Sequence, residues 1–379
     1  MERMRELPMY KKIIFTGPFN VTLYDGGSRS IFELLRFLKG QGHEIYIISL
    51  EGDNGWARQK LKSCIDSLGN EIIARGENFC NFVMDGVNFF YELLPLDQND
   101  ILTGHPHILR RYLDLIEEYP DGYFFTADID LTCLAAHSIL GSPSAHFIHS
   151  PAGSQELFKQ IPRFQKILQK KTVFTVSKFA QALFLNTLDI NSYVWPPFID
   201  PGKSHFQKIK DERKTIGYYS AGSHKGDKII HRLVNEMPQY HFVIMGKVFQ
   251  TILKCDNVTH LGYTSNLESF YEYLSLLLVP SIIAEGYPRV ILEASINGIP
   301  VIANRIGGIP EALGSSGILV ELDADEDKIV GMYISAITKV LSDPDLYAEL
   351  SRKAVARALE YEKELNQVSV DYDKRFFNG

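Results

Sequence analysis

The sequence is poor in cysteine and has no long hydrophobic run. Its 379 residues include four cysteines, Cys64, Cys80, Cys133 and Cys255, which lie far apart and form no Cys-x-x-Cys pair. This excludes a disulfide scaffold and a zinc site of the usual spacing, and predicts reduced thiols in a reducing cytoplasm. Apolar runs such as residues 276–280 are far shorter than the ~20 residues that span a bilayer. We therefore expect a cytoplasmic protein, with peripheral contact to the cytoplasmic membrane face left open.

The sequence also lacks an excess of positive charge. Its 39 Lys and Arg residues are outnumbered by 46 Asp and Glu residues, which gives a formal net charge of −7. A protein that neutralises many phosphates over a wide surface is normally basic, so nucleic acid is not expected as a partner. Hydrophobic residues make up 45% of the chain and charged residues 22%, which is typical of a globular protein and excludes a disordered or collagen-like chain.

Short apolar runs alternate with helical patterns along the chain. Residues 12–16 and 44–50 are predicted strands, and the helix between them is indicated by apolar residues at helical spacing: Ile31, Leu34, Leu35 and Leu38. Strand, helix and strand within forty residues predict a parallel pair and an α/β fold. A single helical stretch is expected over residues 158–168.

A second series of the same kind follows the polar and basic passage at residues 200–214, where we place a domain boundary. Strands and helices alternate again from residue 215 to residue 320, and two or three helices over 325–377 close the chain. Two Rossmann-like doubly wound domains, residues 1–200 and 201–357, are therefore expected. Ligands bind such sheets at the carboxyl ends of the strands, so two facing domains predict a cleft between them.

Residues 279–303 are the most informative stretch for chemistry. A predicted buried strand runs into a loop with Gly286 and Pro288 and then into a predicted helix over 289–296, whose start offers backbone amides and a positive dipole end to an anion. Arg289 adds a guanidinium beside these amides. Glu285 and Glu293 could accept hydrogen bonds from vicinal hydroxyls. The alternative interpretation is two solvated glutamates that flank a helix.

This stretch resembles the Glu-x7-Glu signature of the family-four retaining glycosyltransferases, which have the two-domain GT-B fold. Other elements that resemble the family follow in its order and cover nearly the whole chain: Tyr24-Asp25-Gly26-Gly27, Gly42-His43-Glu44-Ile45, Val176-Ser177-Lys178-Phe179, His224-Lys225-Gly226, Gly262-Tyr263, Pro280-Ser281 and Gly307-Gly308-Ile309-Pro310-Glu311. The resemblance implies metal-independent, retaining hexosyl transfer from a nucleotide-sugar to a hydroxyl acceptor in polysaccharide, glycolipid or natural-product glycoside synthesis. A UDP-sugar is favoured as donor, a GDP-sugar is the alternative, and no tightly bound cofactor is expected.

The resemblance also implies roles for single residues. Glu293 would bind ribose hydroxyls, Glu285 would contact the donor sugar and Lys225 would pair with the diphosphate, where it stabilises the charge that builds as the glycosidic bond breaks. The remaining implied ligands are the backbone of Gly286, Tyr287, Pro288 and Val290, with Gly26 and Gly27 in an N-terminal loop that approaches the phosphates or the acceptor. Residues 1–200 would bind the acceptor, 201–357 would bind the donor, and a helix at about 358–379 would pack back on the N-terminal domain.

His149 lies at the end of a predicted strand, where the family carries a sugar-contacting histidine. A lone histidine is more often structural, and only its position favours a role in the site. His146, three residues earlier, should point to the other side of the strand and be structural.

Two departures from the family pattern concern the phosphate site. Ser220 stands where the family has an arginine, and Arg289 stands where an apolar residue is more common, so Arg289 could restore the missing charge. Pro288 replaces a common glycine and removes one amide donor from the loop.

Several alternatives stay open at this point. A nicotinamide dehydrogenase is disfavoured because residues 17–27 lack Gly-x-Gly-x-x-Gly, whereas a nucleotide-sugar epimerase of the same fold and a non-catalytic relative are kept. Asp128-Ile129-Asp130 has the form of a metal-binding Asp-x-Asp, but a strand-to-helix turn with Asp130 near a helix N-cap is the favoured interpretation.

Two further segments bear on partners. A basic segment, residues 159–171, is expected to be a solvated face, with docking to anionic lipid or to a phosphorylated acceptor as the alternative. The acceptor itself cannot be identified, because it depends on N-terminal segments expected to be loops, such as residues 50–66 and 79–96.

Overall fold

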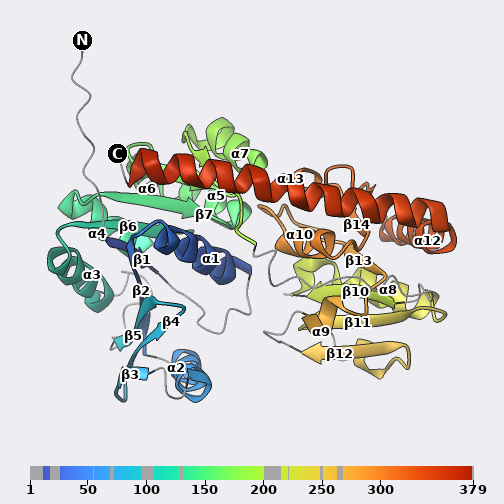
Figure 1. The fold of residues 1–379 in the computed structure, drawn as a ribbon, viewed down its shortest axis with the longest axis horizontal. Helices are drawn as coiled ribbons and strands as arrows, with labels where there is room; N and C mark the ends of the chain where they lie inside the picture. Colours follow the sequence, from blue (N-terminus) through green and yellow to red (C-terminus); the bar gives the residue numbers. More distant parts are fainter. Residues whose placement is uncertain are drawn as a thin grey trace, which may run out of the picture. The chain divides into compact units, whose positions relative to one another are not determined.

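The computed structural model describes residues 12–17, 26–53, 55–68, 72–94, 106–128, 131–199, 215–220, 222–247, 251–262 and 268–377 (Figure 1). The chain divides into two compact units. Unit 1 consists of Met1–Val176, Gln181–Phe198 and Gln367–Gly379, and unit 2 of Ser177–Ala180 and Ile199–Asn366. Among the described helices, none is both long and apolar enough to cross a bilayer.

Unit 1 is built on one mixed sheet. Its described strands lie in the order β3-β4-β5-β2-β1-β6-β7-β8-β9. Their bounds are β1 (Lys12–Thr16), β2 (Glu44–Gly52), β3 (Ile72–Arg75), β4 (Phe79–Met84), β5 (Val87–Leu94), β6 (Gly122–Ala127), β7 (Ser144–Ile148), β8 (Thr172–Thr175) and β9 (Tyr193–Val194). β4 pairs antiparallel with β3 and β5, and the other pairs are parallel. The predicted β1–β2 pair is confirmed, with Ile13 opposite Ile45.

The helices of unit 1 are α1 (Gly26–Gly40), α2 (Gly55–Leu68), α3 (Pro106–Glu118), α4 (Leu131–Leu140), α5 (Pro151–Gln160), α6 (Pro162–Leu168) and most of α7 (Lys178–Leu188). Two predictions are wrong here. The expected loops at residues 50–66 and 79–96 contain α2, β4 and β5. The single helix expected over 158–168 is two helices, because Pro162 has no N–H to continue α5 and instead starts α6.

Unit 2 is built on a wholly parallel sheet, in the order β12-β11-β10-β13-β14-β15. Its strands are β10 (Thr215–Ser220), β11 (His241–Gly246), β12 (Val258–Gly262), β13 (Leu276–Val279), β14 (Val301–Asn304) and β15 (Gly317–Val320). Its helices are α8 (Asp227–Glu236), α9 (Glu268–Tyr271), α10 (Arg289–Ile296), α11 (Ile309–Leu313) and α12 (Glu326–Ser342). The predicted doubly wound organisation of this half is confirmed, and α10 has the predicted bounds.

The last helix, α13 (Pro344–Phe376), begins in unit 2 and ends in unit 1. Its final turns pack on unit 1 through buried polar contacts. Trp195 Nε1 donates to Ser369 Oγ over 2.9 Å, and His43 Nε2 lies 2.7 Å from Asp373 Oδ1. Residues distant in sequence therefore complete the core of unit 1.

Two buried histidines of unit 1 are held neutral. His137, on α4, and His146, on β7, are both fully buried. Burial lowers the pKa of His137 to about 3, helped by the charge of Lys171, and burial lowers the pKa of His146 to about 4.

These pKa values predict that acid destabilises unit 1. An unfolded histidine has a pKa of ~6.5, so between that pH and the lower folded-state pKa the unfolded chain binds more protons than the folded chain. Stability should therefore fall as the pH drops from about 6.5 to 4, by up to ~1.4 kcal/mol per pH unit for each group. Thermal melts from pH 7 to pH 4.5 would measure this.

His137→Phe should lessen the acid dependence, because it keeps an aromatic ring beside Phe124, whose centroid lies 4.7 Å from that of His137, and removes the proton-binding site. The exposed His107 supplies the control His107→Gln, which should leave the dependence unchanged. An equal loss of Tm with acid in wild type and His137→Phe would contradict the prediction.

Candidate active site

The loop after β13 is held by close contact between two backbone segments. Gly308 N–H donates to the Glu285 carbonyl over 2.8 Å. A Cβ on Gly308 would lie 1.9 Å from the Gly286 carbonyl oxygen, and one on Gly307, at φ +60°, would lie 2.6 Å from the Glu285 carbonyl oxygen. Only glycine fits at both positions, so Gly307-Gly308 fixes the backbone that carries Glu285.

The same loop is tied to the segment that carries Lys225. Lys225 closes a short 3-10 helix, Ser223–Lys225, and Ile282 N–H donates to the His224 carbonyl over 3.0 Å. Gly226 has φ +91°, and a Cβ there would lie 2.1 Å from the Pro280 carbonyl oxygen. Lys225 and Glu285, sixty positions apart, are therefore neighbours in unit 2.

Glu285 receives a cation and a hydroxyl. The Lys225 ammonium forms an ion pair with its Oε2, and the Ser281 hydroxyl donates to its Oε1. All three side chains come from one small part of unit 2, at the carboxyl ends of β10 and β13. The negative charge of Glu285 is thus balanced before any ligand binds.

Glu293, on α10, has a matching environment. Arg289 Nε donates to its Oε1 over 3.3 Å, and Tyr271 OH donates to its Oε2 over 2.8 Å. The side chains of Arg289 and Glu293 are only 7% and 12% exposed. Each glutamate of the Glu-x7-Glu pair is therefore oriented by one cation and one hydroxyl.

Ser220 is fully buried at the end of β10. Its hydroxyl donates to Asp227 Oδ1 over 2.8 Å, and Tyr218 OH donates to the same oxygen. Burial and the Asp227 carboxylate raise the pKa of Tyr218, so this phenol stays protonated as a donor. The position where the family has an arginine is thus part of a buried hydrogen-bond cluster at the start of α8.

The other predicted donor-loop residues are mostly buried. Gly286 and Pro288 are buried, Val290 is half-buried, and Pro288 is the N-cap residue of α10. The Tyr287 side chain is also buried and its OH accepts from Arg357 over 3.3 Å, with the ring of Tyr361 5.6 Å away. The Tyr287 side chain is therefore not available to a ligand, and only its backbone could make the predicted contact with a nucleotide-sugar.

In unit 1, His149 directly follows β7 and its side chain is 9% exposed. Its ring stacks on Phe147 at a centroid distance of 4.4 Å, and its Nδ1 lies 3.7 Å from Asp128 Oδ2. His146 has the structural role expected, with Nδ1 2.7 Å from Thr126 Oγ1. Gly26 and Gly27 are the first residues of α1.

Some predicted elements lie outside the described residues, namely Tyr24, Asp25, Asp130 and Tyr263. Within the described ranges, no three His, Cys, Asp or Glu side chains are grouped so that they could hold a metal ion. Sequence reasoning missed Tyr271 and Asp227, and considered Asp128 only as part of the Asp-x-Asp motif. The available signal for Asp128 was its position just after a predicted strand.

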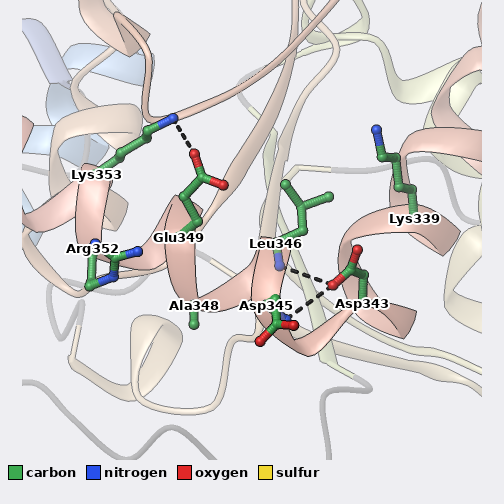
Figure 2. Close-up of a pocket in the computed structure, with 8 residues that line it drawn as sticks. All are labelled: Lys339, Asp343, Asp345, Leu346, Ala348, Glu349, Arg352 and Lys353. Atoms are coloured by element: carbon green, nitrogen blue, oxygen red, sulfur yellow. Dashed lines mark hydrogen bonds and ion pairs between the residues drawn. The ribbon is translucent and has the colours of Figure 1, made fainter.

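A surface hollow between α12 and α13 contains none of the predicted site residues. It is lined by Lys339, Asp343, Asp345, Leu346, Ala348, Glu349, Arg352 and Lys353 (Figure 2). Its carboxylates have local partners: Asp343 Oδ1 accepts the N–H groups of Asp345 and Leu346, and Glu349 pairs with Lys353 over 2.5 Å. These contacts indicate a solvated charged face.

The backbone contact at Gly308 predicts a strong response to a single methyl group. Gly308→Ala should force the Glu285 loop away from residues 307–308 and destabilise unit 2 by about 2 kcal/mol or more, seen as a fall in Tm of several degrees. Gly331→Ala is the matched control, because Gly331 lies in α12 with open space around its Cβ position. It should stabilise the protein by ~0.5–1 kcal/mol. Similar melting of both variants would contradict the prediction.

Part of unit 2 matches a family of known proteins. Residues 225–343 match the family model for glycosyl transferases group 1. O-antigen biosynthesis glycosyltransferase WbnH of Escherichia coli is 28% identical over 136 residues, which are 34% of this chain and 38% of that protein. D-inositol 3-phosphate glycosyltransferase of Acidothermus cellulolyticus is 40% identical over 97 residues, 25% of this chain and 20% of that protein. The matches thus span about two fifths or less of these relatives.

The fold is shared over nearly the whole chain. Anabaena HepE, solved in complex with UDP and glucose, superimposes with a TM-score of 0.71 and 15% identity over 96% of this chain and 100% of that chain. The predicted fold class is confirmed. The chain has the GT-B fold, and its residues 225–343 match the family model for glycosyl transferases group 1.

Proposed function

We propose that the protein transfers a hexosyl group from a nucleotide-sugar to a hydroxyl acceptor. The observation that carries this proposal is the arrangement of Glu285 and Glu293, each held by one cation and one hydroxyl within the segment that matches the family model. The solved complex of HepE with UDP and glucose supports a UDP-sugar as donor. The role of WbnH in O-antigen biosynthesis supports a glycan acceptor.

In this proposal Glu293 binds the ribose hydroxyls and Glu285 binds hydroxyls of the donor sugar. Each carboxylate oxygen has two lone pairs, so the oxygens that accept from Tyr271 and Ser281 can accept from a ligand as well. The two carboxylates are oriented before binding, which reduces the entropy lost on forming these hydrogen bonds. The backbone of residues 286–290 and the first turn of α10 face the sugar and the phosphates.

Lys225 gains a second partner in the proposed reaction. In the free protein its ammonium neutralises Glu285, and with donor bound it also contacts the diphosphate. The charge on the leaving diphosphate grows as the glycosidic bond breaks, so this contact is stronger in the transition state than in the ground state. Arg289 supplies the second cation in place of the arginine absent at position 220.

We further propose that the transfer retains the anomeric configuration and needs no metal ion. The leaving phosphate accepts the proton of the acceptor hydroxyl on the same face of the sugar, so positioning and charge stabilisation carry the catalysis. On unit 1, His149 contacts the sugar, and Gly26 and Gly27 at the start of α1 allow close approach of phosphates or acceptor.

The basic segment of unit 1 suits contact with an anionic membrane. Lys159, Arg163, Lys166 and Lys170 are exposed, whereas Phe164 and Ile167 pack against the core. Lys171 is engaged with Ser142 and Ser144. We propose an electrostatic contact by the four exposed cations, without insertion of apolar side chains.

Nucleoside diphosphates should stabilise the protein. UDP at ~100 times its dissociation constant adds ~2.7 kcal/mol to the stability of the native state, a shift of several degrees. Thermal melts with UDP, GDP, ADP, TDP and NAD at millimolar concentration would identify the base. The shift should be lost in Glu293→Gln, reduced in Arg289→Ala, and kept in Glu349→Gln, which alters an exposed carboxylate of the α12–α13 hollow.

A shift with NAD alone, or none with any diphosphate, would contradict the proposed donor. The protein is then incubated with the sugar conjugate of the nucleotide that binds, without an acceptor. This separates transfer from epimerisation, because an epimerase converts the donor sugar by itself.

Binding to anionic vesicles should depend on the basic segment. Each exposed Lys or Arg near an anionic surface contributes ~1 kcal/mol, so replacing Lys159, Arg163, Lys166 and Lys170 by Gln should release the protein from vesicles containing 30% phosphatidylglycerol. The charge-matched control replaces Lys328, Lys339, Arg352 and Lys353 of unit 2, which are also exposed, and should keep binding. Equal sedimentation of both variants with the vesicles would contradict a role for this segment.

A further inference from the structure

We propose that Asp128 is a positioning residue that fixes the tautomer of His149, so that Nδ1 carries the proton and Nε2 accepts a hydrogen bond from a ligand hydroxyl. The assignment of that hydroxyl to a sugar rests on the proposed function. The tautomer itself rests on the contacts of unit 1 alone.

Asp128 stands directly after β6 in an unusual backbone conformation. Its φ is +46°, and the other non-glycine residues with positive φ in the described ranges are also aspartates, Asp85 and Asp189. The conformation is held from two sides, because Asp128 N–H donates to the Phe147 carbonyl over 2.8 Å and His146 Nε2 lies 3.1 Å from the Asp128 carbonyl oxygen. Asp and Asn tolerate this region of φ best among side-chain-bearing residues.

This backbone conformation directs the carboxylate to the start of α5. Oδ1 accepts the N–H of His149 over 2.7 Å and of Ser150 over 2.8 Å. Burial alone would raise the pKa of Asp128, but the adjacent His149 imidazole and these two N–H groups outweigh burial and lower the pKa. The carboxylate is therefore an anion whose first oxygen accepts from two backbone N–H groups and, over 3.5 Å, from the Ser154 hydroxyl.

The second oxygen faces the imidazole. Asp128 Oδ2 lies 3.7 Å from His149 Nδ1, an ion-pair distance slightly too long for a hydrogen bond. In the part of the chain that the structure describes, both ring nitrogens of His149 are buried and neither has a hydrogen-bond partner, so a ligand hydroxyl reaches Nε2 only when the side chains around the ring move. Buried polar atoms without partners are rare and destabilising, and they concentrate at functional sites.

The orientation of the ring decides which nitrogen serves the ligand. Stacking on Phe147, with 17° between the ring planes, holds the imidazole with Nδ1 toward Asp128. Because a carboxylate accepts and cannot donate, the neutral ring places its proton on Nδ1. Nε2 then has a lone pair, which suits a hydroxyl donor and disfavours a phosphate oxygen. His149 therefore selects a hydroxyl of the ligand.

The tautomer is directly measurable in the free protein. Long-range proton–nitrogen NMR spectra of histidine-labelled protein at pH 8.5, with His149→Gln to assign the signals, should show His149 protonated on Nδ1. Asp128→Asn should reverse this, because its amide oxygen keeps the two backbone N–H contacts while its NH₂ donates toward Nδ1 and moves the proton to Nε2. Asp85→Asn, at another positive-φ aspartate, should leave His149 unchanged.

A wild-type His149 protonated on Nε2 would overturn the proposal even if Asp128→Asn failed to fold. An unchanged tautomer in a folded Asp128→Asn protein would do the same.

Kinetics test the consequence for transfer. With UDP-glucose as the probe, kcat of Asp128→Asn should fall by ~10–100-fold while KM changes little, as for partners that orient a functional histidine elsewhere. A reversed tautomer with unchanged kcat would reduce Asp128 to a structural role. If UDP-glucose is not turned over by wild type, glucose is excluded as the transferred sugar, and the NMR result still decides the tautomer.

Discussion

The site in unit 2 depends on the contact between the backbones of residues 285–286 and 307–308. This contact leaves no room for a Cβ at Gly307 or Gly308. The loop after β13 is also held by two side-chain hydrogen bonds. Asn304 Nδ2 donates to the Ser281 carbonyl over 3.0 Å, and Tyr333 OH of α12 donates to Asn304 Oδ1 over 2.9 Å. Helix α12, strand β14 and the loop after β13 thus form one buried chain of hydrogen bonds, which sets where Glu285 can lie.

Charge balance is the second constraint on this site. Lys225 and Arg289 neutralise Glu285 and Glu293 one to one. Each carboxylate also accepts a hydroxyl hydrogen bond, Glu285 from Ser281 and Glu293 from Tyr271. A charge at low exposure is tolerated when it is paired and hydrogen-bonded in this way. A diphosphate that enters the site must therefore share these cations with the glutamates.

The parallel strands and α10 could be predicted because their signals are local. Leu276, Leu277, Leu278 and Val279 form a continuous buried run typical of a central parallel strand, and Pro288 and Gly298 bracket α10. The β4–β5 hairpin was missed, although Asp85 and Gly86, both with positive φ, are a common hairpin turn. Its strand VNFFYELL has apolar residues on both faces, which hides the alternation that the burial pattern shows. Partners such as Tyr271 for Glu293 depend on how separate segments pack, and no local pattern contains that information.

Both units use an aspartate to join a strand end to the helix that begins beside it. Asp128 joins the end of β6 to the first turn of α5, and Asp227 joins Ser220, at the end of β10, to the first turn of α8. Ser220 satisfies the buried Asp227 carboxylate with a hydroxyl. Lys225 and Arg289 are the cations paired with the two carboxylates of the Glu-x7-Glu pair in the described part of unit 2.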